Sequence, residues 1–317
     1  MASTQKQLIV LAIGGNSLIV DKQHQTVRDQ YIAVAETCEH IVRLIKEGYR
    51  VVITHGNGPQ VGFILRRSEL SYPQLHMVPL DSCGADTQGA IGYQIQQAMC
   101  NCMRDWPKPV KVATVVTQML VDADDPAFKK PSKPIGSFMD EATAEEHRQK
   151  DNWNIVQDAG RGFRRVVASP VPKEIIELDA IRELVAADFV VVAAGGGGIP
   201  VVKGPDGLLR GADAVIDKDL ATSLLAGKLN ADILIISTAV EKVYLNYGKP
   251  DQKAVDSMTV AEAKQYIKAG HFAAGSMLPK IKAVVEFIEA GGKMAIITDP
   301  PNLAKAVAGQ TGTRIVP

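Results

Sequence analysis

Apolar residues along the chain follow two recurring patterns, which are short continuous runs and longer stretches with a helical period. The run at 8–13 predicts a buried strand. The stretch after it places four apolar residues on one helical face, namely Val34, Cys38, Ile41 and Ile45. The chain therefore opens with a strand followed by a long helix.

The same alternation continues to the end of the chain. Further strands are predicted over 51–54, 111–117, 189–194, 233–237 and 294–298. Helical patterns lie between them, through Arg104, from about 172 to 186, from about 217, and around 259–269 and 278–290. Strands that alternate with helices predict an α/β fold with a mostly parallel sheet covered on both faces.

The segment from about 122 to 170 interrupts this pattern. It holds three prolines and many charges, and it shows no long apolar period, so a disordered linker is one interpretation. Its four aromatic residues, Phe128, Phe138, Trp153 and Phe163, favour a small structured excursion instead. We predict an inserted subdomain here.

Composition limits the function classes. The 35 basic and 35 acidic residues balance, which argues against a nucleic-acid or membrane-surface partner. No apolar run is long enough to span a membrane. The four cysteines (Cys38, Cys83, Cys100 and Cys102) are few and scattered, which predicts incidental thiols, no metal site and a reduced, cytoplasmic setting.

Glycine clusters directly follow three of the predicted strands. They read IGGN at 13–16, THGNGPQVG at 54–62 and GGGGIP at 195–200. Loops at the carboxyl ends of parallel strands line a common crevice, and glycines let backbone amides approach a phosphate. The spacing fits neither the dinucleotide-binding pattern nor the P-loop. His55, which opens the second cluster, is either a general base or, more commonly in such a loop, a structural hydrogen-bond donor.

The first glycine turn contains no cation, so the positive charge that a phosphate needs must come from elsewhere. Lys218 stands between Asp217 and Asp219 at a predicted helix start, where two carboxylates keep a lysine charged and oriented. Lys280 follows Pro279 near another helix start, and Lys133 lies in the proline-stiffened PSKPIG of the insert. Each could be a surface lysine; together with the glycine loops they predict phosphoryl transfer.

The motifs AIGGN, THGNGPQVG, SKPIG, DAGRGFRRVV, GGGGIPV, AVIDKDLA and GHFAAGSMLPKI occur in the order typical of carbamate kinases. From residue 8 to about 300 the chain resembles these enzymes, which belong to the amino acid kinase superfamily. The resemblance implies a three-layer α/β/α sandwich with a mostly parallel open sheet and a small protruding subdomain. It also implies a homodimer that transfers phosphate between ATP and carbamate, giving ADP and carbamoyl phosphate.

The resemblance further implies roles for individual residues. The catalytic residues would be three lysines and one aspartate: Lys133 would close over the carbamate side, Lys218 and Lys280 would hold the ATP phosphates, and Asp219 would position Lys218 and Lys280. The substrate and phosphate contacts would come from Gly14, Gly15, Asn16, Gly56, Asn57, Gly195, Gly196 and Gly197. The nucleotide would lie against 237–251 and the start of the helix near 278, through Thr238, Val243, Tyr244 and Met277. Mg²⁺ would be carried on the ATP or ADP, with no protein ligand.

The resemblance also implies two lobes. Residues 1–187 would bind carbamate and form the dimer, with the insert at about 122–170, and residues 188–317 would bind the nucleotide. Acetylglutamate-type relatives carry a lysine two positions before the glycine pair, where this chain has Ala12. Lys133 of the insert is the implied substitute.

Four positions depart from the family pattern. Asp86 stands at a normally apolar position, Glu241 replaces a common aspartate, Lys242 replaces an apolar or aromatic residue, and Ala168 replaces a proline. We expect Glu241 and Lys242 to face solvent rather than to alter nucleotide preference.

Rival functions stay open at this point. One is an amino acid kinase acting on a larger carboxylate, and another is a non-catalytic sensor of nucleotide or carbamoyl phosphate. A dinucleotide-dependent redox protein is a more distant third. If the chain is a carbamate kinase, ATP synthesis is the chemically easier direction, as in arginine fermentation.

Overall fold

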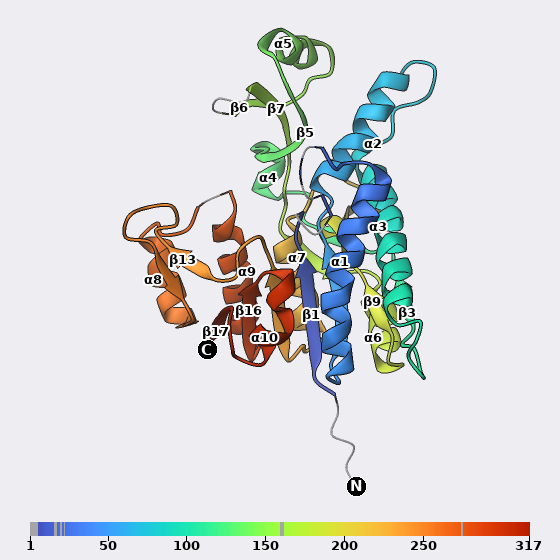
Figure 1. Cartoon of the computed structure of the whole chain (residues 1–317). Coiled ribbons are helices and arrows are strands. Elements are labelled where there is room, and N and C mark those ends of the chain that lie inside the picture. Colours follow the sequence, from blue (N-terminus) through green and yellow to red (C-terminus); the bar gives the residue numbers. More distant parts are fainter. Residues whose placement is uncertain (1–5, 16–17, 20, 22, 159–161, 274) are drawn as a thin grey trace.

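An eight-stranded sheet forms the middle of the protein in the computed structural model, which describes residues 6–15, 18–19, 21, 23–158, 162–273 and 275–317 (Figure 1). In spatial order its strands are β15 (Ser257–Thr259), β17 (Thr313–Val316), β16 (Met294–Thr298), β12 (Ile233–Ser237), β1 (Leu8–Ile13), β2 (Arg50–His55), β9 (Val190–Val192) and β3 (Val112–Thr114). The strands from β16 to β3 run parallel, whereas β17 is antiparallel to β16. The predicted mostly parallel sheet is confirmed.

Strand β1 shows why the protein has three layers. All of its residues are buried, and the side chains of a strand point alternately to opposite faces. Its even-numbered residues pack in a core with α6 (Leu178–Ala186), α7 (Lys218–Lys228), α8 (Val260–Lys268) and α9 (Met277–Glu289). Its odd-numbered residues pack in a second core with α1 (Val27–Lys46), α3 (Leu80–Cys102) and α10 (Leu303–Val307). Helices thus cover both faces of the sheet.

Helix α1 forms as its sequence pattern predicts. Thr26 caps the amino end, and Asp29 completes a reciprocal capping box with it. The predicted apolar face packs on the sheet, and Gly48 ends the helix with a φ of 98°.

The order of the strands places a crevice above β1. After β1 the chain first builds β2, β3 and β9 on one side, and it later builds β12 and β16 on the other. The loops that follow β1 and β12 therefore diverge at their carboxyl ends. Ligands of open parallel sheets bind at such a point.

Two sequence predictions need correction. Residues 172–175 form strand β8 (Pro172–Ile175), not the start of a helix, because they pair antiparallel with β4 (Gln118–Val121). The predicted strand at 111–117 is shorter, since the amide of Thr117 leaves the sheet and donates to the Gln88 side chain. The hairpin of β10 (Ile199–Lys203) and β11 (Leu209–Gly211) was not predicted as strands, although the turn between them was.

The segment 122–170 is folded, as its aromatic residues indicate. It contains α4 (Pro126–Lys129), β5 (Lys133–Met139), α5 (Glu141–Lys150), β6 (Ile155–Asp158) and β7 (Gly162–Val167). The strands form a separate antiparallel sheet in the order β5-β7-β6, which stands above the main body in Figure 1. We refer to residues 126–167 as the subdomain.

Arginine–aromatic contacts hold the subdomain together. Guanidinium groups lie 4.6, 5.0 and 5.5 Å from the ring centroids of Trp153, Phe138 and Phe163. The His147 ring also stacks on Trp153 at 4.0 Å. Within α5, Ala144 is the buried residue. Ile135 and Val167 also pack with α2 in a small apolar cluster, so the subdomain combines cation–π contacts with a minor apolar core.

The remaining elements are α2 (Gly58–Ser71), which rises beside the subdomain, and a small hairpin of β13 (Val243–Leu245) and β14 (Lys253–Val255). Two short 3₁₀ helices complete the described elements, η2 (Gly195–Gly197) and η3 (Pro300–Asn302). None of the helices in the described part of the chain is both long enough and apolar enough to cross a bilayer.

We expect Leu11→Ala to lower the free energy of unfolding by roughly 2–5 kcal/mol, because it leaves a cavity between β1 and its covering helices. Leu11 is fully buried, whereas Leu70 is 70% exposed and provides the matched control. Urea unfolding should show a change within about 0.5 kcal/mol for Leu70→Ala. Equal effects of the two substitutions would contradict this account of the core.

Candidate active site

A cavity of about 510 Å³ lies at the carboxyl end of the sheet, beneath the subdomain. Its lining includes four predicted residues of the glycine loops, Gly15, Gly56, Asn57 and Gly196. It also includes five charged residues, namely Lys133, Asp217, Lys218, Asp219 and Lys280. The structure therefore brings together most of the predicted phosphate site, including three lysines from distant parts of the chain.

Asp219 joins two of these lysines. Its Oδ1 accepts a hydrogen bond from Lys218 Nζ at 2.5 Å, and its Oδ2 accepts one from Lys280 Nζ at 3.0 Å. Burial alone would raise the pKa of Asp219, but the two ammonium groups outweigh burial and hold it at about 2. A charged carboxylate thus spaces two lysines that would otherwise repel each other.

Asp217 has a different partner from the one that the sequence suggested. We expected both neighbouring carboxylates to orient Lys218, yet Asp217 Oδ2 accepts a hydrogen bond from Lys133 Nζ at 2.9 Å. Its Oδ1 caps α7 by accepting from the backbone N–H of Asp219 at 2.9 Å. Sequence analysis missed Asp217 as a site residue in its own right.

Lys218 is the first residue of α7, and its side chain lines the cavity with only 14% of its surface exposed. Burial lowers the pKa of this ammonium group. Its aliphatic stem lies against Gly56, where an added Cβ would be 3.7 Å from it. A helix amino terminus already carries partial positive charge, so a lysine there favours an anion in the cavity.

The third glycine cluster is packed too tightly for any side chain. A Cβ on Gly195 would lie 2.3 Å from the His55 ring, and one on Gly196 would lie 2.2 Å from the Asn57 amide. A Cβ on Gly197 would lie 2.5 Å from the backbone oxygen of Ile216. Gly195 and Gly197 are buried behind the cavity and shape it from behind, while Gly196 lines it.

Two adjacent polar residues of α3 that were not predicted as site residues hold the glycine loops, Gln88 the third cluster and Thr87 the second. Gln88 donates to the backbone oxygens of Gly195 (3.0 Å) and Thr117 (3.1 Å), and it accepts from the Thr117 amide (2.7 Å). Thr87 accepts from the Asn57 side chain at 2.9 Å. The sequence signal that could have identified them is a pair of adjacent polar residues within a helix that packs on the sheet.

His55 has a structural role. It is 1% exposed, and its Nδ1 pairs with the backbone oxygen of Gly56 at 2.9 Å. Burial lowers the pKa of His55 to about 4, so the ring is neutral at pH 7. The structure favours the hydrogen-bonding role over the general base.

An adjoining cavity of about 430 Å³ shares Gly15, Lys218 and Lys280 with the first and adds Gly14 and Thr238. Asn16 lies outside the described residues. The other predicted nucleotide contacts lie outside the described linings of both cavities. Val243 is fully buried in the core, Tyr244 is half-buried beside Tyr247, and Met277 starts α9. Their role stays a prediction.

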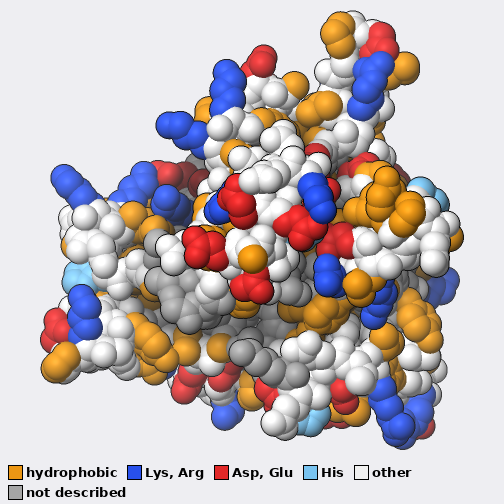
Figure 2. Space-filling model, turned by 90° about the horizontal axis from the view of Figure 1, so that it is seen from above, with side chains coloured by type: hydrophobic (Ala, Val, Ile, Leu, Met, Phe, Trp, Pro, Cys, Tyr) orange, Lys and Arg blue, Asp and Glu red, His pale blue; other side chains and the backbone are white. Residues whose placement is uncertain are grey.

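Three of the four departures from the family pattern lie at or near the surface, whereas Ala168 is buried and forms a β-bridge with Ala214. Glu241 accepts a hydrogen bond from Thr311, and Lys242 pairs with Asp256 at 2.6 Å. Asp86 is exposed on α3. In Figure 2 acidic and basic side chains are intermingled, which fits the balanced composition.

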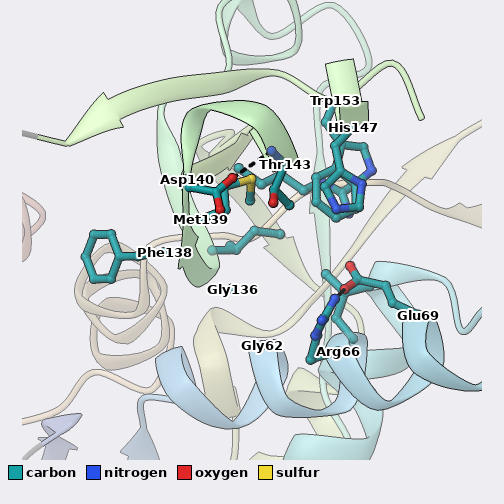
Figure 3. A pocket seen from close by; sticks show the side chains of 13 residues that line it. Gly62, Arg66, Glu69, Gly136, Phe138, Met139, Asp140, Thr143, His147 and Trp153 are labelled. Carbon is teal, nitrogen blue, oxygen red and sulfur yellow. Dashed lines mark hydrogen bonds and ion pairs between the residues drawn. The ribbon is translucent and has the colours of Figure 1, made fainter. Parts of the chain in front are cut away.

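A third cavity of about 320 Å³ lies between α2 and the subdomain (Figure 3). There the two backbones nearly touch, since a Cβ on Gly62 would lie 3.1 Å from the Cα of Gly136. Its labelled side chains include Arg66 and Glu69 from α2, and Asp140 and Trp153 from the subdomain. This cavity mixes charges of both signs, and its described lining contains none of the three lysines of the first cavity.

Comparison with known proteins identifies the family of this chain. The sequence profile of the Amino acid kinase family matches residues 7–299. The chain belongs to the amino acid kinase family. Within it, the resemblance to carbamate kinases is confirmed by relatives that match nearly the whole chain.

Three of these relatives illustrate the match. The chain is 50% identical to the carbamate kinase-like protein YahI of Escherichia coli, over 98% of this chain and 99% of that protein. It is 46% identical to the carbamate kinase of Thermococcus kodakarensis, over 97% and 98% of the two chains. The structure of the Giardia lamblia carbamate kinase bound to AMP-PNP superimposes with a TM-score of 0.93 at 42% identity, covering 99% of each chain.

The low pKa of His55 predicts how stability depends on pH. A histidine in the unfolded chain titrates near 6.5, so between pH 6.5 and 4 the unfolded state binds a proton that the folded state rejects. The contribution of neutral His55 is complete above about pH 6.5 and is lost as the pH falls toward 4. From pH 7 to pH 5 the wild type should lose roughly 1–2 kcal/mol more unfolding free energy than His55→Asn.

Urea unfolding at the two pH values measures this difference. His76 is exposed, so His76→Asn should show the same pH response as the wild type. If His55→Asn also responds like the wild type, His55 is charged or solvated in the folded protein and its structural role is wrong.

Proposed function

We propose that this protein catalyses reversible phosphoryl transfer between ATP and carbamate, giving ADP and carbamoyl phosphate. The observation that carries the proposal is the gathering of Lys133, Lys218 and Lys280 by two carboxylates around one cavity. The relatives named carbamate kinases, one of them bound to AMP-PNP, support the same reaction.

The site fits the chemistry of this transfer. Toward ATP, a β-phosphate oxygen of ADP attacks the phosphorus of carbamoyl phosphate, the bond from phosphorus to the carbamoyl oxygen breaks, and carbamate leaves with that electron pair. No proton moves in this step, so no general base is needed. Catalysis then depends on orientation and on charge stabilisation, which lysines and backbone amides supply.

Mg²⁺ on the nucleotide fits the donor set. The described residues contain no group of three or more His, Cys, Asp or Glu side chains that could hold a metal. Asp217 and Asp219 already pair with lysines. In this proposal phosphate oxygens and water would coordinate the ion, which when bound would neutralise phosphate charge.

Several finer points belong to the same proposal. We place the enzyme in the cytoplasm as a homodimer, working toward ATP synthesis in arginine fermentation. Carbamoyl phosphate is a mixed anhydride with high transfer potential, which favours this direction. The four cysteines are free thiols in the structure, as a reduced compartment requires.

Two observations weigh against the rival functions. Ala12 is fully buried at the position where acetylglutamate-type kinases carry a lysine, so this chain must draw that charge from the subdomain. A sensor would not need three lysines on one small cavity. A panel of acyl phosphates offered with ADP distinguishes the candidates, since ATP should form from carbamoyl phosphate and not from derivatives of larger carboxylates.

We expect Lys218→Met to lower turnover by roughly 10²-fold or more, because one preorganised stabiliser of the phosphoryl group is lost. The assay is ATP formation from ADP and carbamoyl phosphate. Lys228→Met, at the exposed end of the same helix, is the matched control and should retain wild-type turnover. A folded Lys218→Met variant with near-normal turnover would remove Lys218 from the mechanism.

A further inference from the structure

We infer that Asp217 is a positioning residue that holds Lys133 of the subdomain over the phosphate cavity. The inference rests on the proposed function, in which Lys133 contacts the transferring group. Nothing in the sequence motifs assigned Asp217 this task.

The two oxygens of Asp217 do different work. Oδ1 accepts from the backbone N–H groups of Asp219 (2.9 Å) and Leu220 (3.4 Å) and so fixes the carboxylate on the end of α7. Oδ2 then points in a defined direction and accepts from Lys133 Nζ at 2.9 Å. The helix that carries Lys218 and Asp219 thereby also sets the position of the lysine above them.

Residues 213–217 of the main body contact Ala168 and the subdomain, and Asp217 is the last residue of this series. Ala168 forms a β-bridge with Ala214, and its backbone oxygen accepts from the Val215 amide at 2.9 Å. Arg165 pairs with Asp213 at 3.7 Å, but the Asp213 side chain is 69% exposed, so solvent screens that pair. The Asp217 side chain is only 23% exposed, and its partner Lys133 lines the cavity.

Lys133 needs such a partner to act. Its backbone is fixed, because it pairs with Val167 of β7 and precedes Pro134. Its side chain has four rotatable bonds, and an unpaired ammonium group would sample many positions. An ammonium group has three hydrogens, so the one bond to Asp217 leaves two for phosphoryl oxygens. Asp217 can therefore hold Lys133 without withdrawing it from the substrate.

Asp217→Asn separates positioning from capping, because asparagine caps a helix as well as aspartate does. We expect its unfolding midpoint to match the wild type. Its kcat should fall by roughly tenfold to hundredfold, with a much smaller change in KM for ADP. The double variant Asp217→Asn/Lys133→Met should be no slower than Lys133→Met alone, since both remove one interaction.

Asp213→Asn is the matched control, because it makes the same change four residues away and removes the other ion pair to the subdomain. It should retain wild-type kcat. The inference is overturned if Asp217→Asn turns over as fast as Asp213→Asn, or if the Asp217→Asn and Lys133→Met effects multiply in the double variant.

Failure of the proposed function gives a different result. If the wild type forms ATP and Lys218→Met does not, the proposed function stands whatever Asp217→Asn does. If the wild type forms no ATP, the rate of trypsin cleavage within 122–170 tests whether Asp217 holds the subdomain through Lys133. Faster cleavage in Asp217→Asn and Lys133→Met than in Asp213→Asn supports it, and equal rates overturn it.

Discussion

Two carboxylates in the first turn of one helix, Asp217 at the N-cap and Asp219 two residues later, make the cationic site possible. Three ammonium groups around one cavity repel each other, and burial adds to the cost of their charge. Asp219 offsets this for Lys218 and Lys280, and Asp217 does so for Lys133. Because α7 carries both carboxylates, its amino terminus fixes the geometry of lysines that come from three separate segments. The three ammonium groups therefore keep their positions before an anion binds, despite their mutual repulsion.

Backbone atoms form much of the rest of the cavity lining, and close packing fixes their positions. The glycine loop after β9 lies so close to His55, Asn57 and Ile216 that no side chain fits between them. Gln88 ties the same loop to the end of the β3 segment. The cavity floor is therefore a rigid surface set by close backbone contacts, while the charged wall is set by ion pairs.

Sequence patterns predicted the parts of the structure that local periodicity determines. The strand at 8–13, helix α1 and the helix starting at Lys218 follow from their own residues. The helix predicted to begin at residues 172–175 was wrong there, because a distant partner strand and not local propensity decides their conformation. The lysines were found through motif resemblance. The Asp217 partner could not be found, because Lys133 lies 84 residues earlier in the chain and only the folded subdomain brings the two together.

The arginine–aromatic contacts of the subdomain have a consequence for local opening of the enzyme. Such contacts are individually modest, and the apolar cluster that joins the subdomain to α2 is small, so both add less to global stability than the two large apolar cores. The subdomain should open as a separate cooperative unit, with amide hydrogens that exchange at a far lower free energy than those of β1. Ligands can then enter and leave when the subdomain opens, because its local unfolding leaves the amino end of α7 in place.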